Sequence, residues 1–363
     1  MNLLRNRLRY ILLALPLLFF ACKNKDVAPD TDDVVYVGSE DKRLYAIDAA
    51  TGAKKWEYLT GGSIYSSPIV SNGVVYVGSA DSKLYAIDAA AGAKKWEFLT
   101  GNYVTSNPVV SNGIVYMGSL DKKVYAIDAG TGAGKWVFST GGMVYSSPVV
   151  SNGIVYVGSE DGRLYALDAM SGAKKWEFRT GGSIEATPVI SNGLVYVGSY
   201  DKRLYAIDAA IGTQKWDFLT GNSIAINAAI SNGVVYVSSF DGKCYALDAV
   251  TGAKKWDYAG GARGFGTSVA NGIVYAAMGH NQYALDAATG TKKWELATGL
   301  DTRFNTISNG VFYAGSNDGK LYATDAATGT GKWSFTTSAN DSFYGYPCVV
   351  TKQGKVVRGS PGN

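Results

Sequence analysis

Short apolar runs separated by turn residues recur along the chain from residue 34 to about residue 350. In the segment 62–101, the runs are 66–70, 74–78, 83–88 and 93–98, and they are rich in Val, Ile, Tyr and Phe. The first two are joined by an Asn-Gly pair, and the others by turns that carry Asp or Gly. Asn-Gly is a strong hairpin signal, and short apolar runs between such turns indicate strands. The pattern therefore predicts four antiparallel strands in each unit of about 40 residues.

The unit repeats eight times, and a single tryptophan marks each copy. Five successive steps between these residues are 40 residues long and the last two are 38 and 39, while each Trp follows an Asp by eight residues. The tryptophans are Trp56, Trp96, Trp136, Trp176, Trp216, Trp256, Trp294 and Trp333. A repeat of four short strands predicts an all-β fold, an eight-bladed β-propeller of four-stranded antiparallel blades. We expect each Trp to dock one blade on the next, with its N–H bonded to a turn carbonyl of the adjacent Thr-Gly segment.

The two ends of the repeat region complement each other. Residues 34–37 correspond to the second strand of a blade, and no first strand precedes them, whereas residues 346–350 match the missing first strand. Both termini are thus expected to share the closing blade, which leaves few open strand edges. Residues 355–360 resemble one more second strand, and the pattern gives them no place.

The N-terminus has the layout of a secretory signal. Three arginines precede an apolar stretch of about a dozen residues that ends in Ala21-Cys22. The stretch is too short for a transmembrane helix. A small residue followed by Cys at the end of the apolar run resembles the bacterial lipobox, in which the Cys is lipidated and the chain is cut before it. The resemblance implies that residues 1–21 are a lipoprotein signal peptide and that Cys22 is lipidated. We expect residues 22–33 to form a flexible tether and residues 34–363 to form the propeller. The alternative is an ordinary signal peptide with an incidental cysteine.

Charge and composition narrow the chemistry. The net charge is +4, and lysines recur singly or in pairs before each Trp, so no concentrated basic stripe for nucleic acid is present. One His and three Cys are too few for a His- or Cys-based metal site. Cys244 and Cys348 replace aliphatic residues of other repeats and are expected to be core residues; a disulfide between them is the alternative.

The motif Ala-x-Asp-x-x-[Thr/Ser]-Gly-x-x-x-Trp resembles the tryptophan-docking repeat of the PQQ-like, or quinoprotein-dehydrogenase-like, propeller family. The resemblance covers residues 34–350. Enzymes of that family hold the quinone in the central channel, with calcium, a stacking Trp and, in alcohol dehydrogenases, two adjacent cysteines. None of these can be placed here, because every Trp is used for docking and no Cys-Cys pair exists. We therefore expect no PQQ, no metal and no enzymatic activity; a PQQ-dependent alcohol or sugar dehydrogenase is the less favoured alternative.

A lipidated cysteine, a short tether and one propeller together resemble BamB-like lipoproteins of outer-membrane β-barrel assembly. The resemblance implies a monomeric scaffold that is lipid-anchored to the outer membrane, on the periplasmic side or at the cell surface. Its partners would be envelope proteins, including the β-barrel assembly machinery. A surface-displayed propeller that binds glycans or proteins is the alternative, because the near-identical repeats show no obviously specialised blade.

The copies diverge most in three segments that lead into first strands. Arginine beside aromatic residues is typical of binding hot spots, so we expect a partner-facing patch on one rim of the channel; the alternative is that these copies have merely decayed. The candidates are Arg263, Phe265, Asp301, Arg303, Phe304, Phe343 and Tyr344. Apolar residues at the hairpin tips Leu120, Tyr200 and Phe240 suggest a second contact surface. His280, in a shortened hairpin, is expected to be a turn residue.

Overall fold

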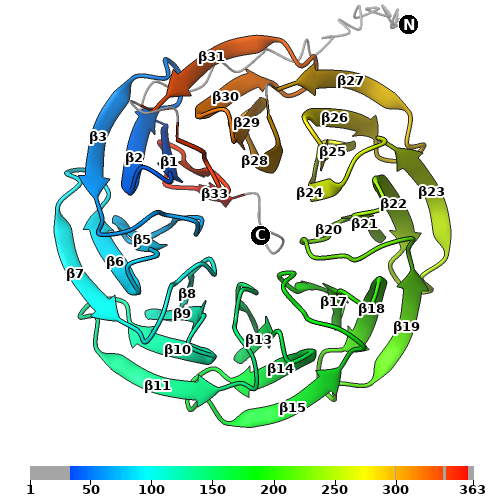
Figure 1. Ribbon diagram of the computed structural model, residues 1–363, viewed down its shortest axis with the longest axis horizontal. Helices are drawn as coiled ribbons and strands as arrows, with labels where there is room; N and C mark the ends of the chain where they lie inside the picture. Colours follow the sequence, from blue (N-terminus) through cyan, green and yellow to red (C-terminus); the bar gives the residue numbers. More distant parts are fainter. Residues whose placement is uncertain (1–32, 299, 338–340, 359–363) are drawn as a thin grey trace, which may run out of the picture.

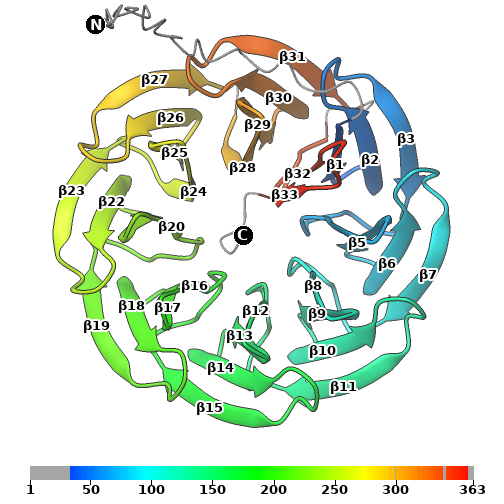
Figure 2. The same ribbon diagram turned by 180° about the vertical axis from the view of Figure 1, so that it is seen from behind.

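The computed structural model describes residues 33–298, 300–337 and 341–358, and within these ranges the chain forms strands and no helix. The strands make eight antiparallel sheets arranged as a ring, with the first strands near the axis and the outer strands on the perimeter (Figures 1 and 2). The predicted eight-bladed propeller is confirmed. We number the blades by the chain order of the Trp on each outer strand, and we name the four strands of a blade first, second, third and outer.

Blade 1 contains β33 (Val356–Arg358), β32 (Cys348–Val350), β1 (Val34–Gly38), β2 (Arg43–Asp48) and β3 (Lys54–Leu59), from the axis outward. Blades 2 to 4 contain β4 (Ile69–Ser71), β5 (Val74–Gly78), β6 (Lys83–Asp88), β7 (Lys94–Leu99); β8 (Val109–Ser111), β9 (Ile114–Ser119), β10 (Lys123–Asp128), β11 (Gly134–Ser139); and β12 (Val149–Ser151), β13 (Ile154–Gly158), β14 (Arg163–Asp168), β15 (Lys174–Arg179). Blades 5 and 6 contain β16 (Val189–Ser191), β17 (Leu194–Gly198), β18 (Arg203–Asp208), β19 (Gln214–Leu219); and β20 (Ala229–Ser231), β21 (Val234–Ser238), β22 (Lys243–Asp248), β23 (Lys254–Ala259). Blades 7 and 8 contain β24 (Gly264–Ala270), β25 (Ile273–Met278), β26 (Asn281–Asp286), β27 (Lys292–Ala297); and β28 (Thr302–Ser308), β29 (Val311–Ser316), β30 (Lys320–Asp325), β31 (Gly331–Thr336).

Tight hairpins join the first and second strands. In blade 2, Asn72 and Gly73 both have positive φ, 49° and 71°, and Ser71 pairs with Val74 across the turn. Two successive residues in the left-handed region define a type I′ turn, whose twist matches that of the flanking strands. The Asn-Gly pair therefore sets the register that buries one face of each strand against the neighbouring blade.

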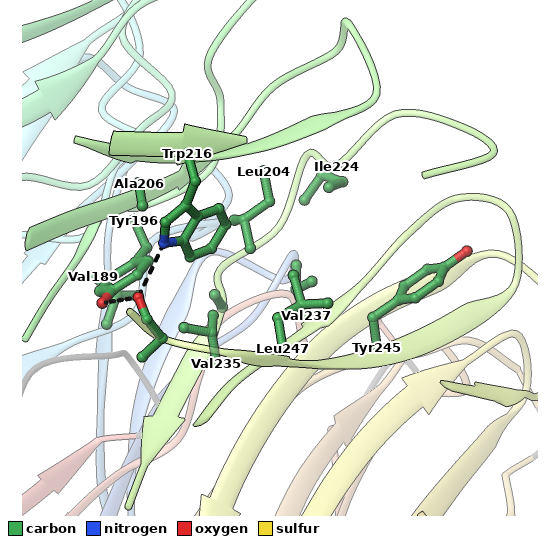
Figure 3. Close-up of a cluster of buried hydrophobic side chains, with 12 residues drawn as sticks. Val189, Tyr196, Leu204, Ala206, Trp216, Ile224, Val235, Val237, Tyr245 and Leu247 are labelled. Atoms are coloured by element: carbon green, nitrogen blue, oxygen red, sulfur yellow. Dashed lines mark hydrogen bonds between the residues drawn. The ribbon is translucent and has the colours of Figure 1, made fainter. Parts of the chain in front are cut away.

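The predicted docking role of the tryptophans is confirmed at every blade interface. In Figure 3, the Trp216 indole N–H donates to the carbonyl of Ala249 in the next blade over 3.1 Å, and the Tyr196 hydroxyl donates to the same oxygen over 2.9 Å. The acceptor belongs to the turn before Thr251-Gly252, as expected. The other seven indoles donate to Ala89, Ala129, Ala169, Ala209, Ala287, Ala326 and Ala49 in ring order, at 2.9 to 3.1 Å.

The motif aspartate organises the turn that receives each Trp. In blade 4, Asp168 Oδ1 accepts the backbone N–H groups of Met170 and Ser171, and Asp168 Oδ2 pairs with Lys175 at 3.2 Å. The lysine that precedes each Trp makes the same ion pair in all eight blades, so these lysines are more than solvated charges along a strand edge. The recurrent aspartates therefore serve as turn formers, which agrees with the sequence-based interpretation.

Both ends of the repeat region close the ring. The first strand of blade 1, β32, pairs with β1 through Val34 opposite Val350, and the Trp333 indole donates to Ala49 at 2.9 Å. The segment that the sequence pattern could not place forms β33, which pairs with β32 through Val357 opposite Val349. Blade 1 is thus a five-stranded sheet whose innermost strand lies closest to the axis (Figure 1).

The core consists of layers between blades, and both described cysteines belong to it. Cys244 on β22 and Cys348 on β32 are free and buried, and burial raises the pKa of these thiols to about 12 and about 11. Their role as core residues is confirmed, and they form no disulfide. Cys22 and the rest of the predicted signal and tether, up to residue 32, lie outside the described residues. No described segment forms a helix with the length and apolar character needed to cross a bilayer.

Candidate functional site

A concave cup lies at the axis of the ring, on the face formed by the segments that enter the first strands. Its cavity volume is about 590 Å³, and the described side chains that line it come from blades 1 to 7. We call this site the aromatic cup. Its lining residues are Tyr65, Tyr103, Thr105, Leu120, Tyr145, Glu185, Tyr200, Ala225, Ile226, Phe240, Arg263, Phe265 and Tyr344.

The wall of the cup repeats one structural position. Tyr65, Tyr145, Glu185 and Phe265 occupy equivalent places before or at the start of first strands, and Tyr344 occupies the corresponding place in blade 1. The rings of Tyr65 and Tyr344 meet edge to face, with centroids 5.4 Å apart. Since blades converge at the axis, residues 40 positions apart in sequence become neighbours around one opening.

Two charged groups lie in the wall and both contact aromatic rings or hydroxyls. The Arg263 guanidinium lies 3.5 Å from the centroid of the Phe240 ring and 5.7 Å from that of Phe265. Glu185 accepts a 2.8 Å hydrogen bond from the hydroxyl of Tyr200. Burial raises the pKa of Glu185, although the Tyr200 hydrogen bond and the Arg263 charge oppose that increase. The wall of the cup thus contains one cationic side chain, Arg263, stacked on an aromatic ring, and one carboxyl group, Glu185, bonded to a tyrosine hydroxyl.

The floor of the cup is a belt of polar residues linked from blade to blade. Asn107 Oδ1 accepts the backbone N–H of Ser67 at 2.6 Å, and Ser147 Oγ accepts that of Asn107 at 2.9 Å. Across the axis, the Asn227 amide donates to the hydroxyl of Tyr346 at 3.0 Å, and Tyr346 N–H donates to Ser67 Oγ at 2.7 Å. Tyr346 is 2% exposed. Tyr346 thus links blades 1 and 6, which are not neighbours, across the axis below the aromatic wall.

The C-terminal strand makes a second contact between blades that are not neighbours. The Arg358 guanidinium on β33 donates to the carbonyl of Pro108 in blade 3 at 2.9 Å. This contact ties the fifth strand of blade 1 to a blade two positions further round the ring.

Comparison with known proteins identifies the family of the chain and solved structures that share its fold. The family model described as "Outer membrane protein assembly factor BamB" matches residues 23–139, 120–227 and 222–343. The chain belongs to this family. Among solved structures, BamB of Moraxella catarrhalis is 22% identical with a TM-score of 0.69, covering 83% of this chain and 93% of that chain.

Two further structures show how widely the fold is shared. The computationally designed Ika8 protein is 17% identical with a TM-score of 0.72, covering 82% of this chain and 96% of that one. A europium-containing methanol dehydrogenase is 15% identical with a TM-score of 0.73, covering 83% of each chain. None of the curated proteins matches the chain in sequence. At these identities the structural likeness establishes the propeller fold, and the family assignment rests on the family model.

Membership of the BamB family, and the dehydrogenase among the structural neighbours, prompt a test for a quinone and its metal. All eight Trp lie at blade interfaces, where their N–H groups are bonded, and Cys244 and Cys348 lie in separate blades. Within the described ranges, no three His, Cys, Asp or Glu side chains converge to hold a metal ion. Tyr346 and the polar belt line a smaller cavity, of about 120 Å³, below the cup. These residues do not fit pyrroloquinoline quinone held with calcium.

The structure brings only some of the predicted partner residues together. Arg263, Phe265 and Tyr344 line the cup, where they meet the predicted hairpin tips Leu120, Tyr200 and Phe240. Asp301 instead faces His280, with Oδ1 3.2 Å from the imidazole Nδ1. The side chains of Arg303 and Phe304 lie outside the described residues.

Phe343 corrects the prediction for its segment. It is 1% exposed and packs in the core between blades 8 and 1, with its ring centroid 6.4 Å from that of Tyr45 and 6.4 Å from that of Phe335. Adjacent residues of an extended segment point to opposite sides, so Tyr344 faces the cup while Phe343 faces the core. Phe343 is therefore not available to a partner.

Sequence reasoning missed four major residues of the wall, namely Tyr65, Tyr103, Tyr145 and Glu185. Tyr65 and Tyr145 belong to ordinary copies of the repeat, so divergence between copies did not mark them. The available signal was their position, which is equivalent to that of Phe265 one or more periods away. Only closure of the ring shows that these positions share one cavity.

Proposed function

We propose that this BamB-family protein is a non-catalytic scaffold of the cell envelope that binds other proteins during outer-membrane β-barrel assembly. The proposal rests on the family match, which spans residues 23–343 in three overlapping segments. A ring closed by the pairing of β32 with β1 supports it, because such a fold presents fixed loops to partners. The polar belt and Tyr346 line the axis with amide and hydroxyl groups that bond to one another, which favours binding over redox chemistry.

Crosslinking in native membranes tests the partner. Photoreactive residues placed at exposed positions of the cup rim, such as Tyr103 (47% exposed), should recover components of the barrel-assembly machinery. The matched control is the same residue at Met170 (73% exposed), in a turn of the opposite face. Recovery of no assembly component from any position would contradict the proposed role.

The proposal includes a lipid anchor at Cys22. Replacing Cys22 with Ser removes the thiol that would be acylated and should release the protein into the soluble periplasmic fraction. Fractionation followed by immunodetection measures the change, and Cys244→Ser serves as the control because that thiol is buried in blade 6. Unchanged membrane retention of Cys22→Ser would show that the anchor lies elsewhere.

The competing redox role has its own experiment. The purified protein, supplied with pyrroloquinoline quinone and calcium, should show no dye-linked oxidation of alcohols or sugars. Steady turnover that depends on both additions would overturn the non-catalytic proposal, whatever the crosslinking result.

A further inference from the structure

We propose that the aromatic cup binds a neutral saccharide. The cavity of about 590 Å³ falls within the range of about 300–1,000 Å³ that is usual for small-ligand sites. The Asn227–Tyr346 hydrogen bond crosses the axis below the cup, and the cavity there is only about 120 Å³, so the cup suits a compact ligand or the end of a chain. This inference goes beyond the scaffold role and does not depend on it.

The side chains of the wall combine ring faces with hydroxyl groups. Five of the lining residues are tyrosines and two are phenylalanines. Blades 1 to 7 each contribute one of these rings to the opening. Aromatic faces carry negative potential and attract the positive edges of polarised C–H groups, while tyrosine hydroxyls donate and accept hydrogen bonds. A sugar ring presents C–H groups on its faces and hydroxyls at its periphery, and it therefore satisfies both features together.

The charges in the cup favour a neutral ligand. Arg263 and Glu185 supply one positive and one potential negative charge within the same wall. The Tyr200 hydroxyl uses one acceptor position of the Glu185 carboxylate at 2.8 Å, and a carboxylate has about four such positions. The planar guanidinium and the carboxylate can each bond two neighbouring hydroxyls, which is the geometry of a sugar diol.

The same contacts argue against a quaternary ammonium ligand. Aromatic cages bind such cations through the ring faces, but the Arg263 guanidinium already lies 3.5 Å from the centre of the Phe240 ring. A second cation would meet a like charge there. The cup is also unsuited to adding a peptide strand to a sheet, because its wall is made of side chains and the innermost strands of blades 2 to 6 are three residues long.

Calorimetry and saturation-transfer NMR on the purified full-length protein test the proposal with maltotetraose, cellotetraose and chitotetraose as separate probes. At least one should bind with a Kd of about 1 mM or tighter. Tyr145→Ala should weaken that binding at least ~10-fold, whereas Tyr145→Phe, which keeps the ring, should stay within ~3-fold. Tyr145 is 37% exposed, so its replacement should leave the thermal midpoint unchanged.

Leu99→Ala provides the matched control, because Leu99 is an exposed apolar residue (68%) on the outer strand β7, away from the cup. Its binding should equal that of the unaltered protein. Absence of binding by all three probes at about 10 mM, binding that survives Tyr145→Ala, or clear preference for tetramethylammonium or a galacturonic acid tetramer would overturn the proposal. If Tyr145→Ala instead abolishes crosslinking to assembly proteins without any saccharide binding, the cup is a protein site and the scaffold role stands.

Discussion

At the scale of single residues, one carbonyl accepts two hydrogen bonds from the preceding blade at seven of the eight blade interfaces, and at the eighth Ala49 O accepts the Trp333 N–H. Ala249 O receives the Trp216 N–H and the Tyr196 hydroxyl, and the face of the Trp176 ring packs on Gly212 one interface earlier. Each interface thus combines a large ring, a bonded indole N–H and a glycine that allows close approach. Because these three features recur at every interface, their energetic contribution is multiplied around the ring.

Trp216 allows the contributions of ring and hydrogen bond to be separated. Trp216→Ala should lower the free energy of unfolding by about 3–5 kcal/mol, because the side chain is 9% exposed and leaves a cavity. Trp216→Phe keeps most of the ring and should cost about 1–2 kcal/mol, since Ala249 O still receives the Tyr196 hydroxyl. Denaturant unfolding measures both. Equal effects of the two variants would show that the hydrogen bond, and not the ring, dominates.

The glycine that faces each Trp can be tested against a glycine with the same backbone. Gly172 has φ 71° and a Cβ there would lie 2.7 Å from the Trp136 ring, whereas Gly153 has φ 73° and open space around it. Gly153→Ala should cost about 1–2 kcal/mol from backbone strain alone. Gly172→Ala should cost at least about 1 kcal/mol more, because the ring must also move. Equal thermal midpoints for the two variants would contradict close packing of Trp on glycine.

Acid should unfold the protein through the motif aspartates. The backbone N–H of Ser171, its hydroxyl and Lys175 lower the pKa of Asp168 to about 2, and the pKa of the equivalent carboxyl is lowered in every blade. The unfolded value is about 3.9, so this stabilisation is present above pH 4 and is lost as the pH falls toward 2. The thermal midpoint should therefore be steady from pH 5 to 7 and fall steeply below about pH 4.

The combined variant Asp88→Asn, Asp128→Asn, Asp168→Asn keeps a side-chain acceptor in three turns and removes their titration. Its midpoint should be lower at pH 6 and should fall less between pH 5 and pH 3 than that of the unaltered protein. An identical decline in both proteins would place the acid sensitivity in other carboxyl groups.

At this scale the interface residues could be predicted, but the residues of the cup only in part. The period alone identifies Trp56 and its seven equivalents, since a residue that recurs in register must meet the same neighbour each time. The prediction for Phe343 was wrong because it assigned every aromatic residue of a divergent segment to the partner surface. Alternate residues of an extended segment face opposite sides, so only Tyr344 lines the cup. Tyr145 looked like an ordinary part of the repeat and gave no local signal.

At the scale of strands, the ends of the chain and blades 7 and 8 depart from the repeat. The first strands β24 and β28 are seven residues long, against three in blades 2 to 6. Residues that the sequence suggested were divergent loops, such as Gly264 and Phe265, therefore begin a strand. The closing strand β32 was predictable from its match to other first strands. The position of β33 was not, because no other blade has a fifth strand within the described part of the chain.

Truncation should separate the roles of β32 and β33. Ending the chain at residue 351 removes β33 and the Arg358 contact with Pro108, and should leave a folded protein with a moderately lower thermal midpoint. Ending it at residue 343 also removes β32 and the Tyr346 contacts, which leaves blade 1 with three strands and an open edge. We expect that chain to aggregate or to lose cooperative unfolding. Similar circular dichroism and melting of both truncated chains would contradict closure by β32.

At the scale of the whole molecule, the ring holds a cup above a belt of polar residues at the axis. The period and the blade count could be derived from the sequence because they depend on recurrence, and the repeat motif resembles the propeller family to which the chain belongs. The cup was predicted only in part, because it depends on which side chains from different blades face one another after closure. A BamB-family ring built in this way is suited to hold and present partners, and its own residues do not fit a quinone site.

The proposed role in barrel assembly predicts a defect in cells that lack the protein. The most direct measurement is quantitative proteomics of folded β-barrel proteins in the outer membrane, comparing cells without the gene, with the gene restored, and with Cys22→Ser restored. The account predicts reduced barrel levels without the gene and recovery only with the anchored form. Unchanged barrel levels in cells lacking the protein would contradict it.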